Sequence, residues 1–356
     1  MKILIIKLSA IGDVIHTLPA LNAIRKKYPD AHITWLVEEA ASGLIKGHPA
    51  IDRILVSKRK QWIKDLSGLS CMNSIKEASG FIKKLRDTRY DLVIDFQGLL
   101  KSAILAGLSK GKCKAGFGRG MEHQEHSYLF LNKRISPVSM DNHALKRSLM
   151  LIDSMGIGCG DIVFNLPVTG HDKRLADDLL DNFLNNSLIG HEIKAPRLLF
   201  AVNPVAKWET KLWSNGKFAV LADRLIEQYN ARVVFTGSAQ DRKIIQSIIS
   251  DMKQEAADLS GKTSLKVLAA IYERANCLVS TDTGPMHLAA AVGTPVVALF
   301  GPTAPWRTGP FGKGHKIIRA GLCCSPCFKR QCTAIDCMKQ ISVDDVLAGV
   351  NKLDLT

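Results

Sequence analysis

The stretch Ser280-Thr281-Asp282-Thr283-Gly284-Pro285-Met286-His287-Leu288-Ala289-Ala290-Ala291-Val292-Gly293-Thr294-Pro295 stands between two short apolar runs, residues 277–279 and 296–300. Apolar runs of this length are typical of buried strands, and the small residues between them predict a helix over residues 285–292. Pro285 suits the first helical position, where its missing N–H is not needed, and Gly293 and Pro295 end the helix. The stretch therefore predicts a strand–helix–strand unit of a parallel sheet.

The turn at Asp282, Thr283 and Gly284 joins the first strand to this helix. Open α/β sheets bind ligands at the carboxyl ends of their strands. The free N–H groups and the dipole of a helix N-terminus favour an anion such as a diphosphate. An anion site is one interpretation of the turn, and an ordinary strand-to-helix connection is the alternative that the pattern leaves open.

Length and charge set broad limits on the protein. A chain of 356 residues predicts two domains, each with its own core. Its net charge of +15 should attract phosphates, acidic lipids or nucleic acid. No apolar run reaches about 18 residues, so no transmembrane helix is expected. Residues 1–7 are too short for a signal peptide and predict a first strand, so we expect a cytoplasmic protein.

Strands and helices alternate along both halves of the chain. The patterns predict strands at residues 2–7, 31–37, 53–56, 91–95, 197–202, 232–236, 277–279 and 296–300, with helices between them. Residues 58–64 and 110–126 read as basic or glycine-rich loops, and residues 156–170 as a linker. The alternation favours two α/β domains with doubly wound parallel sheets.

The first strand leads into a loop, residues 8–13, and a helix predicted over residues 14–27. The loop lacks the G-x-G-x-x-G pattern of dinucleotide-binding proteins. Asp13 stands at the helix start, where a carboxylate serves either as a helix N-cap or as a functional group.

Three motifs together resemble one family: Lys7-Leu8-Ser9-Ala10-Ile11-Gly12-Asp13-Val14, residues 280–291, and Phe300-Gly301-Pro302-Thr303. Over nearly its whole length the chain resembles the ADP-heptose:lipopolysaccharide heptosyltransferases of glycosyltransferase family 9. Residues 95–103, DFQGLLKSA, resemble the branch that adds the first heptose. The resemblance implies a GT-B architecture, with two Rossmann-like doubly wound domains facing a cleft. Residues 1–165 would bind the acceptor, residues 166–340 the nucleotide sugar, and residues 341–356 would form a helix near the domain interface.

The resemblance also implies an activity. The enzyme would move heptose from ADP-L-glycero-D-manno-heptose to Kdo2-lipid A with inversion, needing no cofactor. Its partners would be the donor, the anionic lipid acceptor and the cytoplasmic surface of the inner membrane, to which it would bind peripherally. Transfer of the second heptose or a later sugar is an alternative, and a GT-B sugar-nucleotide 2-epimerase is a second. Nucleic-acid binding rests on charge alone, since no helix-turn-helix, zinc-finger or RNA-binding motif is present.

Asp13 matches the proposed general base of the family, and a second set matches its donor contacts. These donor-binding candidates are Lys207, Lys211, Asp241, Thr263, Asp282, Thr283, Gly284 and His287. The family often carries hydroxyl residues where this chain has Ala206 and Lys207, so the charge of Lys207 would have to replace them. Purely structural roles are the alternatives: Lys211 would be a solvated loop lysine, His287 would pack in the core, and Asp282 would only shape its turn.

The candidates for acceptor binding lie in the first half: Ser9, Ala10, Gly12, Lys58, Arg59, Lys60, Gln97 and Lys101, with Lys64, Lys112 and Arg119 as further basic residues. No D-x-D pair occurs in the sequence, so we expect Lys211 and a helix N-terminus, not a metal ion, to neutralise the diphosphate. Near the C-terminus four cysteines lie close together in the sequence: Cys324, Cys327, Cys332 and Cys337. Their spacing is not a standard zinc pattern, so a structural zinc site is the less favoured interpretation, and free thiols or a redox disulfide are preferred.

Overall fold

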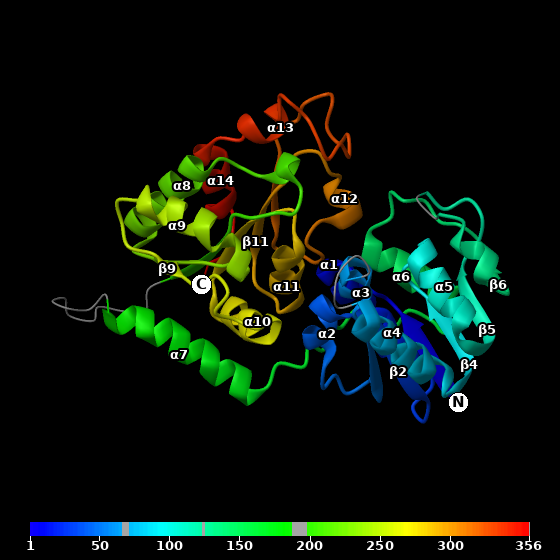
Figure 1. The fold of residues 1–356 in the computed structure, drawn as a ribbon. Coiled ribbons are helices and arrows are strands. Elements are labelled where there is room, and N and C mark those ends of the chain that lie inside the picture. Colours follow the sequence, from blue (N-terminus) through cyan, green and yellow to red (C-terminus); the bar gives the residue numbers. More distant parts are fainter. Residues whose placement is uncertain (66–70, 123–124, 187–197, 356) are drawn as a thin grey trace. The chain divides into compact units, whose positions relative to one another are not determined.

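The structure is a computed structural model that describes residues 1–65, 71–122, 125–186 and 198–355. It divides into two compact units, Met1–Pro167 and Val168–Thr356. Each unit contains one six-stranded parallel sheet with helices on both faces (Figure 1). The boundary lies close to the one predicted after residue 165.

The sheet of unit 1 has the strand order β3-β2-β1-β4-β5-β6. This order is the one of nucleotide-binding Rossmann sheets, with its reversal point between β1 and β4. The elements of unit 1 are β1 (Lys2–Ile6), α1 (Ile11–Lys27), β2 (His32–Glu38), α2 (Glu39–Ile45), β3 (Arg53–Ser57), α3 (Arg59–Asp65), α4 (Cys71–Arg86), β4 (Arg89–Asp95), α5 (Leu100–Leu108), β5 (Lys110–Phe117), η1 (Ser127–Phe130), β6 (Lys133–Ile135) and α6 (Ala144–Asp153).

Alternate residues of β1 face opposite sides of this sheet, because side chains alternate along a strand. Leu4 and Ile6 share a buried core with Phe81 of α4 and Leu105 of α5. On the other face α1 and α6 pack against each other. The sheet is thus buried on both faces, and only its strand ends are available for a site.

Unit 2 repeats the same topology with the order β12-β11-β10-β7-β8-β9. Its elements are α7 (Gly170–Asn186), β7 (Leu199–Asn203), η2 (Glu209–Lys211), α8 (Asn215–Tyr229), β8 (Arg232–Phe235), η3 (Ala239–Asp241), α9 (Arg242–Ser250), β9 (Ala257–Asp258), α10 (Leu265–Arg274), β10 (Cys277–Thr281), α11 (Gly284–Ala291), β11 (Val296–Leu299), α12 (Pro305–Thr308), β12 (Lys316–Ile318), α13 (Asp336–Lys339) and α14 (Val343–Val350). The strand–helix–strand unit predicted around residues 280–295 is confirmed as β10, α11 and β11.

The last helix, α14, belongs to unit 2. It packs on α8 and β12, and Val346, Leu347 and Val350 enter the same core as Phe218. The helix starts with a capping box at Ser342, since Asp345 accepts from the Ser342 N–H at 2.8 Å. The predicted place of this helix beside a domain interface stays a prediction.

Two sequence-based predictions about loops were wrong. Most of segment 58–64 lies in α3, a short helix stabilised from outside, because Trp62 packs on Phe81 of α4 with ring centroids 5.4 Å apart. The start of segment 110–126 is strand β5, whose sequence KGKCKAGF shows no apolar alternation. Main-chain pairing with β4 holds this strand in the sheet, and its composition gives no sign of that.

Candidate active site

Asp13 lies in the first turn of α1, just beyond the carboxyl end of β1. The helix begins at Ile11 with Ala10 at the N-cap position, so the N-cap interpretation of Asp13 was wrong. Its Oδ2 accepts a hydrogen bond of 2.8 Å from the Ala10 N–H. In the described part of the chain Oδ1 has no hydrogen-bond partner. One oxygen therefore fixes the carboxylate, and the other is available to accept a proton.

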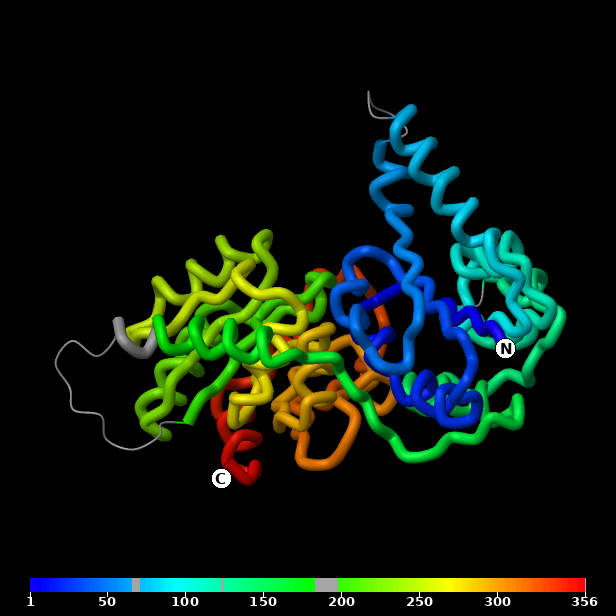
Figure 2. The backbone as a smooth tube through the Cα atoms, turned by 90° about the horizontal axis from the view of Figure 1, so that it is seen from below, coloured from blue at the N-terminus to red at the C-terminus, as the bar shows by residue number. Residues whose placement is uncertain are grey.

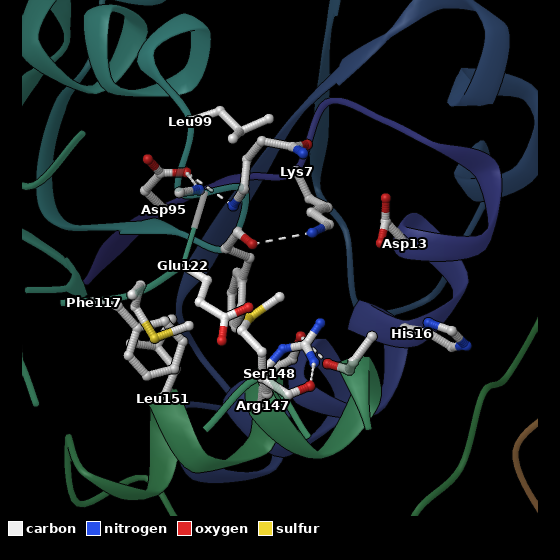
Figure 3. A pocket seen from close by; sticks show the side chains of 16 residues that line it. Lys7, Asp13, His16, Asp95, Leu99, Phe117, Glu122, Arg147, Ser148 and Leu151 are labelled. Carbon is white, nitrogen blue, oxygen red and sulfur yellow. Dashed lines mark hydrogen bonds between the residues drawn. The ribbon is translucent and has the colours of Figure 1, made fainter. Parts of the chain in front are cut away.

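Asp13 lines a cavity of about 180 Å³ inside unit 1 (Figure 3). Titratable side chains of both signs share this lining: Lys7, His16, Asp95, Glu122 and Arg147. They come from the loop after β1, from α1, β4 and α6, and from the segment after β5. None of these five was among the site residues predicted from the sequence, although Lys7 and Asp95 stand beside strand ends, where parallel sheets form their sites.

Asp95 organises the loop after β4. Its Oδ1 accepts from the N–H groups of Gln97 and Gly98, and its Oδ2 from the Ser102 hydroxyl. Burial raises the pKa of Asp95 above its ordinary value, and these bonds and the nearby Lys7 oppose the rise. Because the carboxyl is buried and bonded inward, its role is to shape the loop that carries Gln97.

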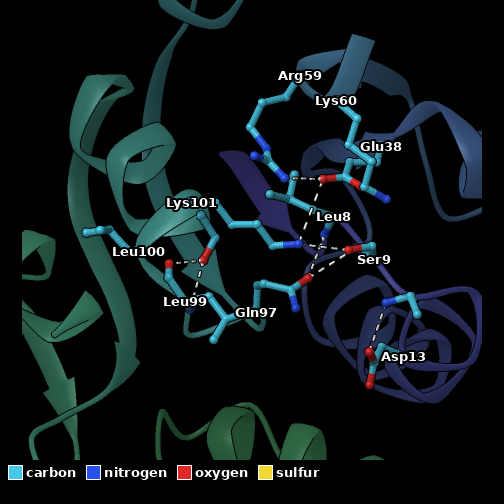
Figure 4. Close-up of polar contacts among 12 residues, drawn as sticks. Leu8, Ser9, Asp13, Glu38, Arg59, Lys60, Gln97, Leu99, Leu100 and Lys101 are labelled. Atoms are coloured by element: carbon cyan, nitrogen blue, oxygen red, sulfur yellow. Dashed lines mark hydrogen bonds and ion pairs between the residues drawn. The ribbon is translucent and has the colours of Figure 1, made fainter. Parts of the chain in front are cut away.

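The loops after β1 and β4 are joined by side chains predicted to bind the acceptor. Gln97 Oε1 accepts from the N–H groups of Leu8 and Ser9, both at 3.1 Å. Lys101 Nζ donates to Ser9 Oγ at 2.9 Å. The structure thus brings Ser9, Gln97 and Lys101 together beside the turn that holds Asp13 (Figure 4).

A buried carboxylate, Glu38 at the end of β2, gathers three of the basic side chains. Its oxygens lie 2.8 Å from Lys60 Nζ, 3.2 Å from an Arg59 guanidinium nitrogen and 3.8 Å from Lys101 Nζ. We call these four residues the Glu38 cluster (Figure 4). Burial raises the pKa of Glu38, but the bonds and charges of Lys60, Lys101 and Arg59 outweigh it, and the pKa lies below its ordinary value. Three cations against one carboxylate leave an excess of positive charge here.

The other basic candidates lie outside this cluster. Lys58 approaches Glu39 and Glu77, at 4.0 and 3.9 Å. Lys64 is exposed near the end of α3, Lys112 lies in β5, and Arg119 is exposed in the segment that follows β5. Ala10 and Gly12 flank the start of α1.

Unit 2 has a second polar group at the carboxyl ends of its strands. Lys211 Nζ lies 2.7 Å from Asp282 Oδ2, and the same oxygen accepts from the Thr303 hydroxyl at 2.6 Å. Lys211 Nζ also sits 4.5 Å from the centre of the Trp208 ring, over which Arg330 lies at 4.9 Å. The loops after β7, β10 and β11 therefore meet at one cationic point.

A comparison with known proteins identifies the family. The model of glycosyltransferase family 9 (heptosyltransferase) matches residues 79–337. Lipopolysaccharide heptosyltransferase 1 of Pseudomonas aeruginosa is 33% identical over 334 residues, which cover 94% of this chain and 88% of that protein. This chain belongs to glycosyltransferase family 9. A second relative, lipopolysaccharide heptosyltransferase 1 of Escherichia coli K12, is 28% identical to the present family 9 transferase, over 90% of this chain and 94% of the relative.

The fold of this transferase agrees with solved structures. The E. coli heptosyltransferase WaaC with ADP superposes with a TM-score of 0.77 at 24% identity, covering 99% of both chains. The E. coli ADP-heptose lps heptosyltransferase II gives a TM-score of 0.73 at 22% identity, covering 99% of this chain and 98% of the other. Two Rossmann-like units in one chain are the GT-B architecture that the family resemblance implied. Family membership also decides for a transferase over a 2-epimerase.

The remaining donor-binding candidates of the transferase occupy varied surroundings. Thr283 is the N-cap residue of α11, Gly284 is its first residue, and His287 is buried one turn later. Lys207 is exposed. These positions are compatible with donor binding, which stays a prediction for each.

The last two donor candidates are Asp241 and Thr263. Asp241 Oδ2 accepts from both the N–H and the hydroxyl of Ser238, at 2.7 and 2.6 Å. Thr263 is half-buried and precedes Ser264, which caps α10 by accepting from Val267 N–H. The contacts of Asp241 and Thr263 with the nucleoside also stay predictions.

Cysteines of the C-terminal segment lie close enough to influence one another. Burial and the nearby Cys327, Cys324 and Cys332 raise the pKa of Cys337. All four are free thiols, and no group of three or more potential metal ligands forms among the described residues. Within the same residues no helix is long and apolar enough to cross a membrane.

Proposed function

We propose that this family 9 transferase moves heptose from ADP-L-glycero-D-manno-heptose to the Kdo2-lipid A inner core during lipopolysaccharide synthesis. The observation that carries the proposal is Asp13, with one carboxylate oxygen fixed by the Ala10 N–H and the other without a hydrogen-bond partner among the described residues. Relatives named lipopolysaccharide heptosyltransferase 1 support heptose as the transferred sugar and lipopolysaccharide as the class of acceptor.

The reaction is a single displacement. The acceptor hydroxyl oxygen forms a bond to the anomeric carbon of heptose while the bond from that carbon to the diphosphate oxygen breaks. The electron pair leaves with ADP, and the hydroxyl proton passes to Asp13 Oδ1 as the oxygen becomes acidic. Because one displacement occurs at the anomeric carbon, its configuration is inverted.

The leaving diphosphate needs positive charge that is already in place. Lys211 has three N–H donors, and Asp282 receives two of them, at 2.7 Å through Oδ2 and at 3.4 Å through its carbonyl oxygen. The third donor and the N-terminus of α11 at Gly284 are assigned to the phosphates. Asp282 positions Lys211, and Thr303 in turn positions Asp282.

The acceptor side is assigned to the Glu38 cluster and to Ser9 and Gln97. The carboxylates and phosphates of Kdo2-lipid A are anionic, and the cluster carries more positive than negative charge. Basic side chains near an anionic bilayer contribute about 1 kcal/mol each to binding. We therefore assign the transferase to the cytoplasmic surface of the inner membrane, as a peripheral protein.

The test uses purified protein, ADP-heptose and two acceptors, Kdo2-lipid A and the same lipid already carrying one heptose. We expect release of ADP only when acceptor is present, and a mass gain of one heptose on Kdo2-lipid A. Transfer only to the acceptor that already carries heptose would replace the proposal with a later transfer step. Release of ADP without any acceptor would contradict it.

A further inference from the structure

An open apolar groove lies between α3, α4 and α5 of unit 1, apart from the cavity of Asp13. Its volume is about 550 Å³, within the range of small-molecule pockets. The apolar walls include Trp62, Phe81, Ile82, Ile104, Leu105 and Leu108. Figure 2 shows α3 and α4 side by side, projecting from the rest of unit 1.

Several apolar side chains that line this groove are strongly exposed to solvent. Ile63 of α3 is 55% exposed, and Ile104 and Leu108 of α5 are 42% and 37% exposed. They face one hollow and are not scattered over the unit, since all three line the same groove. A contiguous exposed apolar surface of this kind marks a ligand or membrane contact.

One end of the groove is cationic and continuous with the acceptor loop. Arg59 and Lys101 line the groove and are also members of the Glu38 cluster. Lys101 bonds to Ser9, four residues before Asp13. The acidic residue in the lining, Glu125, accepts from the Leu100 N–H at 3.1 Å. An apolar channel with a cationic mouth complements a hydrocarbon chain that carries an anionic head.

We propose that this groove holds an acyl chain of the lipid acceptor, with the anionic headgroup at Arg59 and Lys101. The proposal rests on the function proposed above, because that function supplies an anionic acceptor with acyl chains. Burial of the chain removes apolar surface of both partners from water, which is the driving force. The chain thereby places the sugar headgroup beside Ser9 and Asp13.

The first experiment compares Kdo2-lipid A with its deacylated form, which has the same sugar headgroup. Ala78 lines the groove, and Ala78→Phe fills it without adding charge. We expect this variant to raise the KM for the acylated acceptor about tenfold, with no change in the KM for the deacylated acceptor or for ADP-heptose. Equal KM changes for both acceptors, or none for the acylated one, would overturn the proposal.

Charge in the groove gives a second variant with a matched control. Ile104→Glu places a carboxylate in the apolar wall of the groove. The control, Ile244→Glu, places one at an isoleucine of α9 in unit 2 that is 40% exposed. Ile104→Glu should raise the acylated-acceptor KM as Ala78→Phe does, and Ile244→Glu should not. If the lipid bound only by non-specific contact with exposed apolar surface, the added phenyl ring of Ala78→Phe would strengthen binding and lower the KM. A lower KM in Ala78→Phe would therefore also contradict occupation of the groove.

A direct binding measurement separates this proposal from the proposed activity. Dodecyl phosphate is titrated into the protein while the fluorescence of Trp62 is followed, and Trp62→Phe identifies that signal. We expect saturable binding in the wild type, at least about tenfold weaker binding in Ala78→Phe, and no response to inorganic phosphate. If the wild type transfers no heptose to any acceptor, the proposed activity fails, and this titration still decides on the groove. Equal binding of dodecyl phosphate by wild type and Ala78→Phe would overturn the groove assignment.

Discussion

Lys211 and Asp282 form an ion pair of 2.7 Å between two loops that are 71 positions apart in the sequence. The two side chains are only 15% and 5% exposed. A lysine held in this way needs little rearrangement when charge develops on a leaving phosphate. The pair therefore links the folding of unit 2 to its proposed chemistry.

Lys211→Met should weaken ADP binding by about 10- to 100-fold, because bonds from a charged donor contribute roughly 1.5–3 kcal/mol. Titration calorimetry with ADP measures this loss. Lys217→Met is the matched control, since Lys217 also lies over a tryptophan, Trp213, but donates to the Ile341 carbonyl. A similar loss of ADP affinity in both variants would show that Lys211 acts only through stability.

Lys58→Gln combined with Lys60→Gln should raise the acceptor KM several-fold and weaken binding to anionic liposomes. Arg59 is left in place so that buried Glu38 keeps a partner at 3.2 Å. Both effects should fade as salt is added, because added ions screen exposed charges. Exposed Lys243 and Lys262 of unit 2 provide the control pair. Wild-type liposome binding by the Lys58/Lys60 variant at low salt would remove this surface from the membrane assignment.

His48 predicts an acid-sensitive fold for unit 1. Its side chain is buried, and burial lowers the pKa to about 4 from 6.5, with the backbone of Phe164 opposing the shift in part. Between these values the unfolded chain binds a proton that the folded chain does not, so the free energy of unfolding falls as pH drops through this window. The loss approaches about 3 kcal/mol near pH 4.

His48→Asn should remove this part of the acid sensitivity, because an amide oxygen can replace Nδ1 in accepting from the Ala50 N–H. Denaturant unfolding at pH 7 and pH 4.5 measures the difference. Exposed His32, changed to Asn, is the control and should unfold like the wild type at both pH values. An unchanged pH dependence in His48→Asn would contradict the assignment.

The sequence predicted the sheet elements best where periodicity was strong. The strand–helix–strand unit around Pro285 was predictable because Pro285 and Gly293 mark the ends of α11. Strand β5 was missed because its eight residues, KGKCKAGF, are held by pairing with a distant strand. The helix α3 was missed because its stability comes from Trp62 packing on another helix.

The candidate site was predictable only as separate motifs. The resemblance gave Asp13, Gln97 and Lys101, but no spacing indicates that Gln97 bonds to Ser9, 88 positions away. Glu38 was missed, although it ends a strand at the edge where sites form. Its importance comes from the three cations that the fold gathers around it, and this arrangement exists only in the folded chain.

Asp13→Asn gives the most direct test of the proposed chemistry. The asparagine keeps an oxygen for the Ala10 N–H but cannot take the acceptor proton. Asp345→Asn is its structural match, because Asp345 holds the same third helical position and accepts from the Ser342 N–H at 2.8 Å. The two variants share the change at a helix start and differ only in the proposed base.

The decisive measurement is kcat for heptose transfer from ADP-heptose to Kdo2-lipid A, with the dissociation constant of ADP measured in parallel. The account predicts that Asp13→Asn lowers kcat by roughly a hundredfold or more and leaves ADP binding unchanged. Asp345→Asn should keep kcat near that of the wild type. A kcat of Asp13→Asn within a few-fold of the wild type, or an equal loss in Asp345→Asn, would contradict the assignment of Asp13 as the base.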